Sequence, residues 1–152
     1  MKKEDLDKEL SARIEKEKAE IIQEKTQAQE NAILLKDFVE KMDYLKDIET
    51  LVDWVNSKHE EDSKKYPVKF QLTHGGNDYA YVYELIAKIG IWGTKKEIMF
   101  SVVNSMRASK FDPHIEIYDT FTHLQTNQTG IKAEKGIDIL KGKMMDIVQE
   151  ER

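Results

Sequence analysis

The sequence predicts an α+β fold: a long N-terminal helix or helical pair, an antiparallel meander of three to four strands, and a C-terminal helix. The first 66 residues contain no Gly or Pro, whereas both Pro and all seven Gly lie from Pro67 onward. Because these residues interrupt regular structure, the chain divides into a helical front and a turn-rich back. A chain of 152 residues fits one hydrophobic core. We therefore expect a charged helical extension over residues 1–29 and a single α+β domain over residues 30–152.

The clearest helix is expected over about residues 30–60. Its apolar residues advance by three or four positions, which places them on one helical face: Leu35, Phe38, Met42, Leu45, Ile48, Val52 and Val55. Trp54 widens this face and favours burial against a sheet. The sequence Thr26-Gln27-Ala28-Gln29 has the form of a capping box, which predicts that the helix breaks and restarts there.

The extension is expected to be a solvated helix with a thin apolar stripe. Ile14, Ile21 and Leu35 belong to a series with seven-residue spacing, but the companion positions hold Glu17 and Glu24, where a coiled-coil seam prefers Leu or Ile. A loosely docked helix is therefore favoured over a sustained coiled coil. Because the stripe is too thin to be buried within one small domain, we expect self-association, most simply a homodimer, through these residues: Leu10, Ile14, Ile21 and Leu35.

Strands are expected behind Pro67, where apolar residues alternate with period two over 68–72 and 79–91. The intervening residues 74–78, which include Gly75 and Gly76, are predicted to form a hairpin connection. Further strands are expected at 98–102 and 115–121. The final helix carries Ile137, Leu140, Met144 and Val148 at helical spacing and is weakened by Gly142.

A second interpretation remains open for residues 84–107. Thr94-Lys95-Lys96-Glu97 also has the form of a capping box, so residues 94–107 can be read as a helix and 84–107 as helix-turn-helix-like. The β-rich residues 79–83 favour the strand interpretation.

Composition excludes several classes of function. The net charge of −5 belongs to residues 1–66, because residues 67–152 are balanced, so no polyanion-binding field is expected. Only three Arg accompany 21 Lys, which weakens a nucleic-acid interpretation. With no Cys and no apolar leader or spanning segment, we expect a cytoplasmic protein without membrane contact.

Two groups of residues are candidates for a site. His114 and Glu116 alternate on one face of a predicted strand, and a metal would need a third ligand such as His74. An exposed polar strand face is the simpler interpretation. Tyr79, Tyr81, Tyr83 and Trp92 are candidates for partner contact or for a base-stacking platform, with a half-buried tyrosine ladder favoured.

The residues specify no reaction, and no cofactor is expected. The favoured hypothesis is a non-catalytic binding or regulatory module that acts through protein–protein contacts and self-association. The alternative is a protein that binds single-stranded nucleic acid or DNA, through the tyrosine face or residues 84–107. A second alternative is a small metal-dependent enzyme or ligand-binding protein that uses His114 and Glu116.

Overall fold

The computed structural model describes residues 2–77, 79–90, 93–104, 111–120 and 128–152. Its elements, in chain order, are α1 (Lys3–Met42), α2 (Tyr44–Glu61), β1 (Val68–Gly76), β2 (Ala80–Ile89), β3 (Thr94–Asn104), β4 (Pro113–Asp119), β5 (Gln128–Ile131), a 3-10 turn (Ala133–Lys135) and α3 (Gly136–Glu150). The α+β prediction is confirmed, including the long N-terminal helix, the antiparallel meander and the C-terminal helix.

The sheet has the order β1-β2-β3-β4-β5, and each strand pairs antiparallel with the next. The fifth strand was not predicted. Residues 80–89 and 94–104 are paired strands, with Leu85 opposite Ile98, so the helix-turn-helix interpretation of residues 84–107 is wrong. The alternation of apolar side chains across that pair, which buries one face of the sheet, explains why strands form here.

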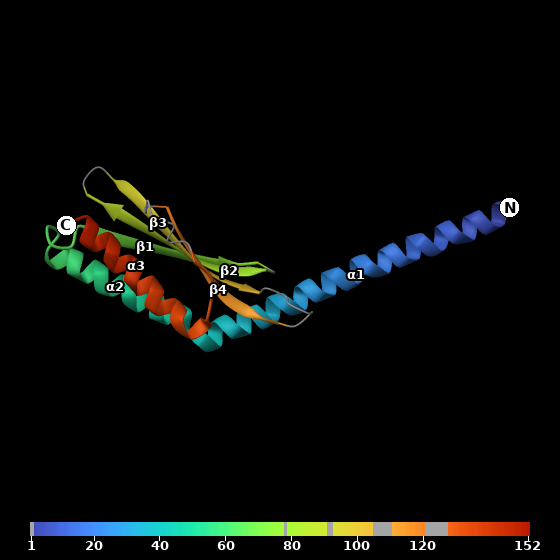
Figure 1. Ribbon diagram of the computed structural model, residues 1–152, viewed down its shortest axis with the longest axis horizontal. Coiled ribbons are helices and arrows are strands. Elements are labelled where there is room, and N and C mark those ends of the chain that lie inside the picture. Colours follow the sequence, from blue (N-terminus) through green and yellow to red (C-terminus); the bar gives the residue numbers. More distant parts are fainter. Residues whose placement is uncertain (1, 78, 91–92, 105–110, 121–127) are drawn as a thin grey trace.

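All three helices lie on the same face of the sheet (Figure 1). α2 lies against β1, α3 lies against β4, and the C-terminal part of α1 crosses β2 and β3. The rest of α1 projects away from the domain, so that the N-terminus lies far from the sheet. Within the described part of the chain, no helix is long and apolar enough to cross a membrane.

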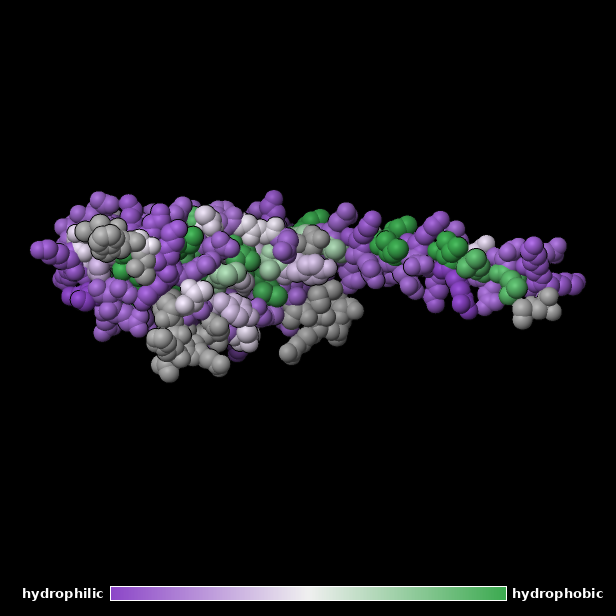
Figure 2. All heavy atoms as spheres, turned by 90° about the horizontal axis from the view of Figure 1, so that it is seen from above, coloured by the Kyte–Doolittle hydropathy of each residue, from purple (hydrophilic) through white to green (hydrophobic). Residues whose placement is uncertain are grey.

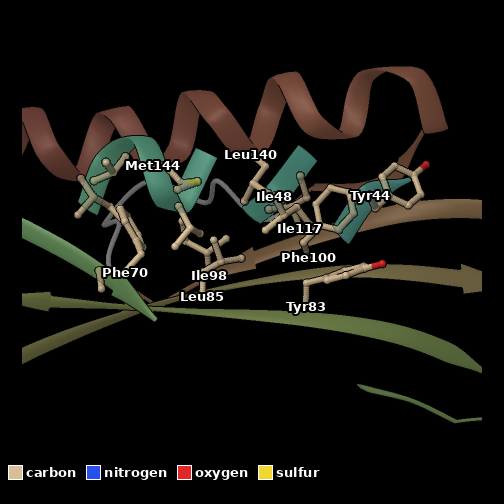
Figure 3. Close-up of a cluster of buried hydrophobic side chains, with 14 of the residues drawn as sticks. Tyr44, Ile48, Phe70, Tyr83, Leu85, Ile98, Phe100, Ile117, Leu140 and Met144 are labelled. Atoms are coloured by element: carbon tan, nitrogen blue, oxygen red, sulfur yellow. The ribbon is translucent and has the colours of Figure 1, made fainter. Parts of the chain in front are cut away.

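The core fills the space between the helices and the covered face of the sheet (Figure 3). Leu140 and Met144 of α3 and Ile48 of α2 pack onto strand residues that include Leu85 and Ile117. Val52 is also buried, as expected for the predicted helical face, and Phe38, Met42 and Leu45 are partly buried. Trp54 is 45% exposed, which corrects the expectation that it lies in the core. Its ring meets Tyr66 at the surface instead.

The break between the first two helices falls at Asp43, not at the Thr26 capping box. Asp43 adopts a left-handed conformation, with φ 57° and ψ 35°. Asp is one of the few residues other than Gly that tolerate this region. Thr26 lies within α1 and donates its hydroxyl to the carbonyl of Ile22, one turn earlier. This intrahelical bond uses the side chain that a cap would have required.

The connection between β1 and β2 is tighter than predicted. His74, Gly75 and Gly76 are the last residues of β1, and neither glycine has a positive φ. Gly76 is instead required by a close approach, since a Cβ there would come within 2.6 Å of the Tyr81 ring. Asn77 then forms the turn by accepting hydrogen bonds from the backbone N–H groups of Tyr79 and Ala80.

Two glycines in α3 provide a matched test of packing. Gly142 lies exposed in the helix, and a Cβ there would meet no atom within 4 Å. We expect Gly142→Ala to raise the free energy of unfolding by about 0.5–1 kcal/mol, because Ala has the higher helix propensity. A Cβ on Gly136 would lie 3.1 Å from both Phe100 and Ile115. Gly136→Ala should therefore cost about 1–3 kcal/mol through overpacking. Urea denaturation measures both variants, and a gain in stability at both positions would contradict this account of the core.

Candidate functional site

The most prominent unpartnered feature of the structure is the projecting part of α1. Every residue from Lys3 to Gln27 is exposed. Figure 2 shows hydrophobic side chains at intervals along this helix. The large exposed hydrophobic residues within residues 3–28 are Leu6, Leu10, Ile14, Ile21 and Ile22. These side chains remain roughly half exposed, so the segment gains little from the hydrophobic effect.

Four of these residues continue the face by which α1 packs on its own domain. Leu6, Leu10, Ile14 and Ile21 are followed at one- or two-turn spacing by Ala28 and then by Leu35 and Val39, so all share one side of the helix. Leu35 was grouped with the predicted oligomerisation residues, but it is only 1% exposed because it packs in the core of its own chain. The stripe therefore begins in the domain core and continues outward, where none of the residues that the structure describes covers it.

Two carboxylates interrupt the stripe. Glu17 and Glu24 occupy turns between the apolar residues, and both are exposed. The projecting segment is otherwise close to electrically balanced, with seven basic and nine acidic residues over 2–30. Arg13 contacts Glu9 at 3.0 Å, one turn away. Such pairs add only a few tenths of a kcal/mol each to an isolated helix.

The predicted tyrosine site is divided between the surface and the core. Tyr79 is 71% exposed, Tyr81 is partly buried, and Tyr83 is fully buried. Trp92 lies outside the described residues. The structure therefore favours the half-buried ladder, because Tyr83 cannot stack on a nucleic-acid base while it lies under the helices. His74 packs beside these tyrosines. Its Nδ1 lies 2.8 Å from the Tyr81 hydroxyl, and its ring stacks on the rings of Tyr81 and Tyr83.

Burial changes the acidity of two core tyrosines. Desolvation, followed by the nearby Glu134, raises the pKa of Tyr44 to about 12. Desolvation, followed by Tyr81, Tyr44 and Asp43, raises the pKa of Tyr83 well above its usual value. The Tyr44 hydroxyl donates to the carbonyl of Ala133 at 3.2 Å. The Tyr83 hydroxyl is buried and has no hydrogen-bond partner among the described residues.

The candidate metal residues form a hydrogen-bonded row on the uncovered face of the sheet. His114 Nε2 lies 3.2 Å from one carboxylate oxygen of Glu116, and the Tyr118 hydroxyl donates to the other at 3.3 Å. The Glu116 charge raises the pKa of Tyr118. The two residues border an open hollow of about 380 Å³ between β4 and β5.

His74 does not join this row. It belongs to β1, at the opposite edge of the sheet from β4 and β5, where its Nδ1 is engaged by Tyr81. Within the described residues, no three His, Cys, Asp or Glu side chains come close enough to hold a metal ion. His114 and Glu116 are therefore arranged for mutual hydrogen bonding.

Sequence reasoning missed a row of lysines on the same uncovered face. Lys69 of β1 lies directly opposite Lys88 of β2, which lies directly opposite Lys95 of β3. Like charges in directly opposed positions destabilise a sheet. The three residues lie on three different strands, and only the strand register places them side by side, so no spacing rule could have identified the row.

The buried tyrosines predict a loss of stability at high pH. The pKa of Tyr44 is raised in the folded state to about 12, so its contribution to the free energy of unfolding is complete below pH 10. That contribution is lost as the pH rises from about 10 to about 12. We expect Tyr83→Phe to leave the free energy of unfolding at pH 7 unchanged or higher, because the hydroxyl has no partner, and to reduce the loss above pH 10. Urea denaturation at pH 7 and pH 11 tests this, with Tyr79→Phe as the exposed control. An alkaline loss in Tyr83→Phe equal to that of the wild type would refute the assignment.

Comparison of the chain with models of known protein families, with curated proteins and with solved structures finds no match.

Proposed function

We propose that the protein is a non-catalytic protein-binding module that self-associates through the projecting part of α1. The observation that carries this proposal is the exposed stripe of Leu6, Leu10, Ile14 and Ile21, which continues the buried face of the same helix. The occupant we propose for the stripe is the same segment of a second copy.

The energetics of an isolated helix support a partner. α1 contains 40 residues, so it is about 60 Å long at 1.5 Å per residue. Most helical stability in proteins comes from packing of an amphipathic face rather than from intrinsic propensity. Within the described residues the projecting segment has no such packing, and a second helix that buries the stripe supplies it.

The charge pattern is compatible with a second copy of the same helix. Seven basic and nine acidic residues over 2–30 leave a net charge of only −2 per segment, so two segments approach each other with little net repulsion. A parallel pair places Glu17 against Glu17 and Glu24 against Glu24 of the two copies. An antiparallel pair avoids these contacts between identical carboxylates, and we therefore propose the antiparallel arrangement.

Charged substitutions in the stripe test self-association directly. We expect the wild-type chain to sediment as a dimer of about 36 kDa, twice the 17.8 kDa chain mass. Ile14→Asp/Ile21→Asp should weaken the dimer by more than about 100-fold, because it introduces unpaired charge into an apolar seam. Ala12→Asp/Ala19→Asp adds the same charge on the opposite face of α1 and should remain dimeric. Analytical ultracentrifugation at tens of micromolar measures all three.

Two results would overturn the proposal: a wild-type mass of 17.8 kDa at these concentrations, or equal dissociation of both double variants. Circular dichroism during thermal unfolding controls for damage to the domain. Because residues 3–27 make no contribution to the core, we expect the domain to stay folded in each variant.

The interrupting carboxylates predict a gain of affinity. Glu17→Leu/Glu24→Leu completes the apolar stripe and removes two charges from the proposed seam, so the dimer should tighten by at least about 10-fold. Sedimentation over a concentration series gives the dissociation constant. An unchanged constant would show that Glu17 and Glu24 lie outside the interface.

A further inference from the structure

We propose that the row of Lys69, Lys88 and Lys95, together with the adjoining hollow at the end of α2, binds a compact ligand that carries two or more linked phosphate groups. This site is separate from the α1 stripe and goes beyond the proposed self-association. It follows from the strand register and from the residues that border the hollow.

The row concentrates positive charge on three neighbouring strands. Lys69, Lys88 and Lys95 are cross-strand partners on the uncovered face, and all three are exposed. Adjacent strands lie about 4.8 Å apart, so the row spans about 10 Å. That distance exceeds the size of one phosphate group and suits a short chain of them. Lysine binds phosphate as a point charge with three rotatable donors.

Most of this charge is not neutralised within the protein. Lys69 contacts Glu60 at 3.4 Å, but both side chains are more than half exposed, so the contact is weak. Among the described residues, Lys88 and Lys95 have no ion-pair partner. A bound polyanion would supply the counter-charge for both.

A hollow of about 400 Å³ adjoins two of the lysines. Lys69 and Lys88 border it together with His59 and Ser63 from the end of α2 and the turn that follows. His59 Nδ1 lies 2.8 Å from the carbonyl of Tyr66, which can only accept, so Nδ1 carries the proton of that bond. The Ser63 hydroxyl is then an additional hydrogen-bond donor for the ligand, whereas Nε2 of the same neutral His59 ring can only accept.

The surroundings make the patch basic although the chain is acidic. Around the hollow and the row, residues 58–69 with 88, 95 and 97 contain six Lys against four Asp or Glu, and the fourth acid, Glu97, lies two residues from Lys95 on the same face of β3. The chain as a whole carries −5. A local field of opposite sign to the net charge draws a small anion to this end of the sheet.

The arrangement also predicts how a ligand changes stability. Three opposed lysines repel one another in the free protein, and a ligand that binds only the folded state stabilises it. Replacing the central lysine by an acid should therefore stabilise the free protein and weaken binding. If Lys88 had only a structural role, its replacement would not both stabilise the free protein and weaken ligand binding.

The experiment titrates tripolyphosphate into the full-length protein at low salt, with binding followed by calorimetry and stability by thermal unfolding. The wild type should bind saturably and unfold at a higher temperature with ligand. Lys88→Glu should unfold at a higher temperature than the wild type without ligand, and should bind at least about 10-fold more weakly. Lys141→Glu makes the same charge change at an exposed position of α3 and should bind as the wild type does.

Further titrations identify the ligand chemistry and distinguish ligand binding from self-association. Tripolyphosphate and ATP share linked phosphates and should both bind, whereas citrate, a carboxylate anion, should bind more weakly. Ile14→Asp/Ile21→Asp should bind tripolyphosphate normally, whether or not it dissociates. The proposal is overturned by the absence of saturable binding at millimolar ligand, by equal weakening in Lys141→Glu, or by citrate binding as tightly as tripolyphosphate.

Discussion

The ring of Phe100 fixes the positions of three elements at once. It lies 5.4 Å from the ring of Tyr44 at the start of α2 and 5.9 Å from the ring of Tyr83 on β2. It also approaches Gly136 so closely that a Cβ there would be 3.1 Å away, so a larger residue at the start of α3 would displace the ring or the helix. Because both helices are held over the same strand, they cover one face of the sheet and leave the other open.

The direction of α1 follows from this arrangement. Tyr44 must enter the core beside Phe100, and Asp43 immediately before it turns the backbone through a left-handed conformation. Val39 and Leu35 remain buried in the preceding turns of α1, whereas the earlier residues are carried beyond the edge of the domain. Asp43 thus lies at the point where the direction of α1 relative to the domain is set. The stripe continues the helix face that packs on the core, and it is exposed because residues 6–21 lie beyond the edge of the sheet.

Local patterns were sufficient for the fold class but not for its boundaries. Period-two alternation identified the first four strands, because burial of one face imposes it directly on the sequence. β5 has only four residues, with Ile131 alone buried, and its pairing with β4 is irregular, so it leaves almost no pattern to detect. The helix break was predicted at Thr26 because capping boxes are recognisable in sequence. A left-handed Asp43 has no comparable signature in the sequence.

The two candidate surfaces also differ in how far the sequence alone reveals them. Leu10, Ile14 and Ile21 were found from helical spacing, because a helix face is encoded within one segment. The lysine row is encoded by the register of three strands, and a shift of one residue in either pairing would move its members to opposite faces. Sequence charge counts could not reveal it, because residues 67–152 sum to zero.

The two proposed surfaces lie at opposite ends of the sheet. α1 leaves the domain near the hairpin of β1 and β2, where Tyr81 covers Gly76, whereas Lys88 lies seven residues further along β2. At about 3.3 Å per residue, this separates them by about 23 Å. The Debye length at physiological salt is about 8 Å, so charge bound at the lysine row has little direct effect on the helix stripe. If two copies pair through α1 as proposed, both lysine rows stay accessible, and we expect each copy to bind the proposed anion independently of the dimer.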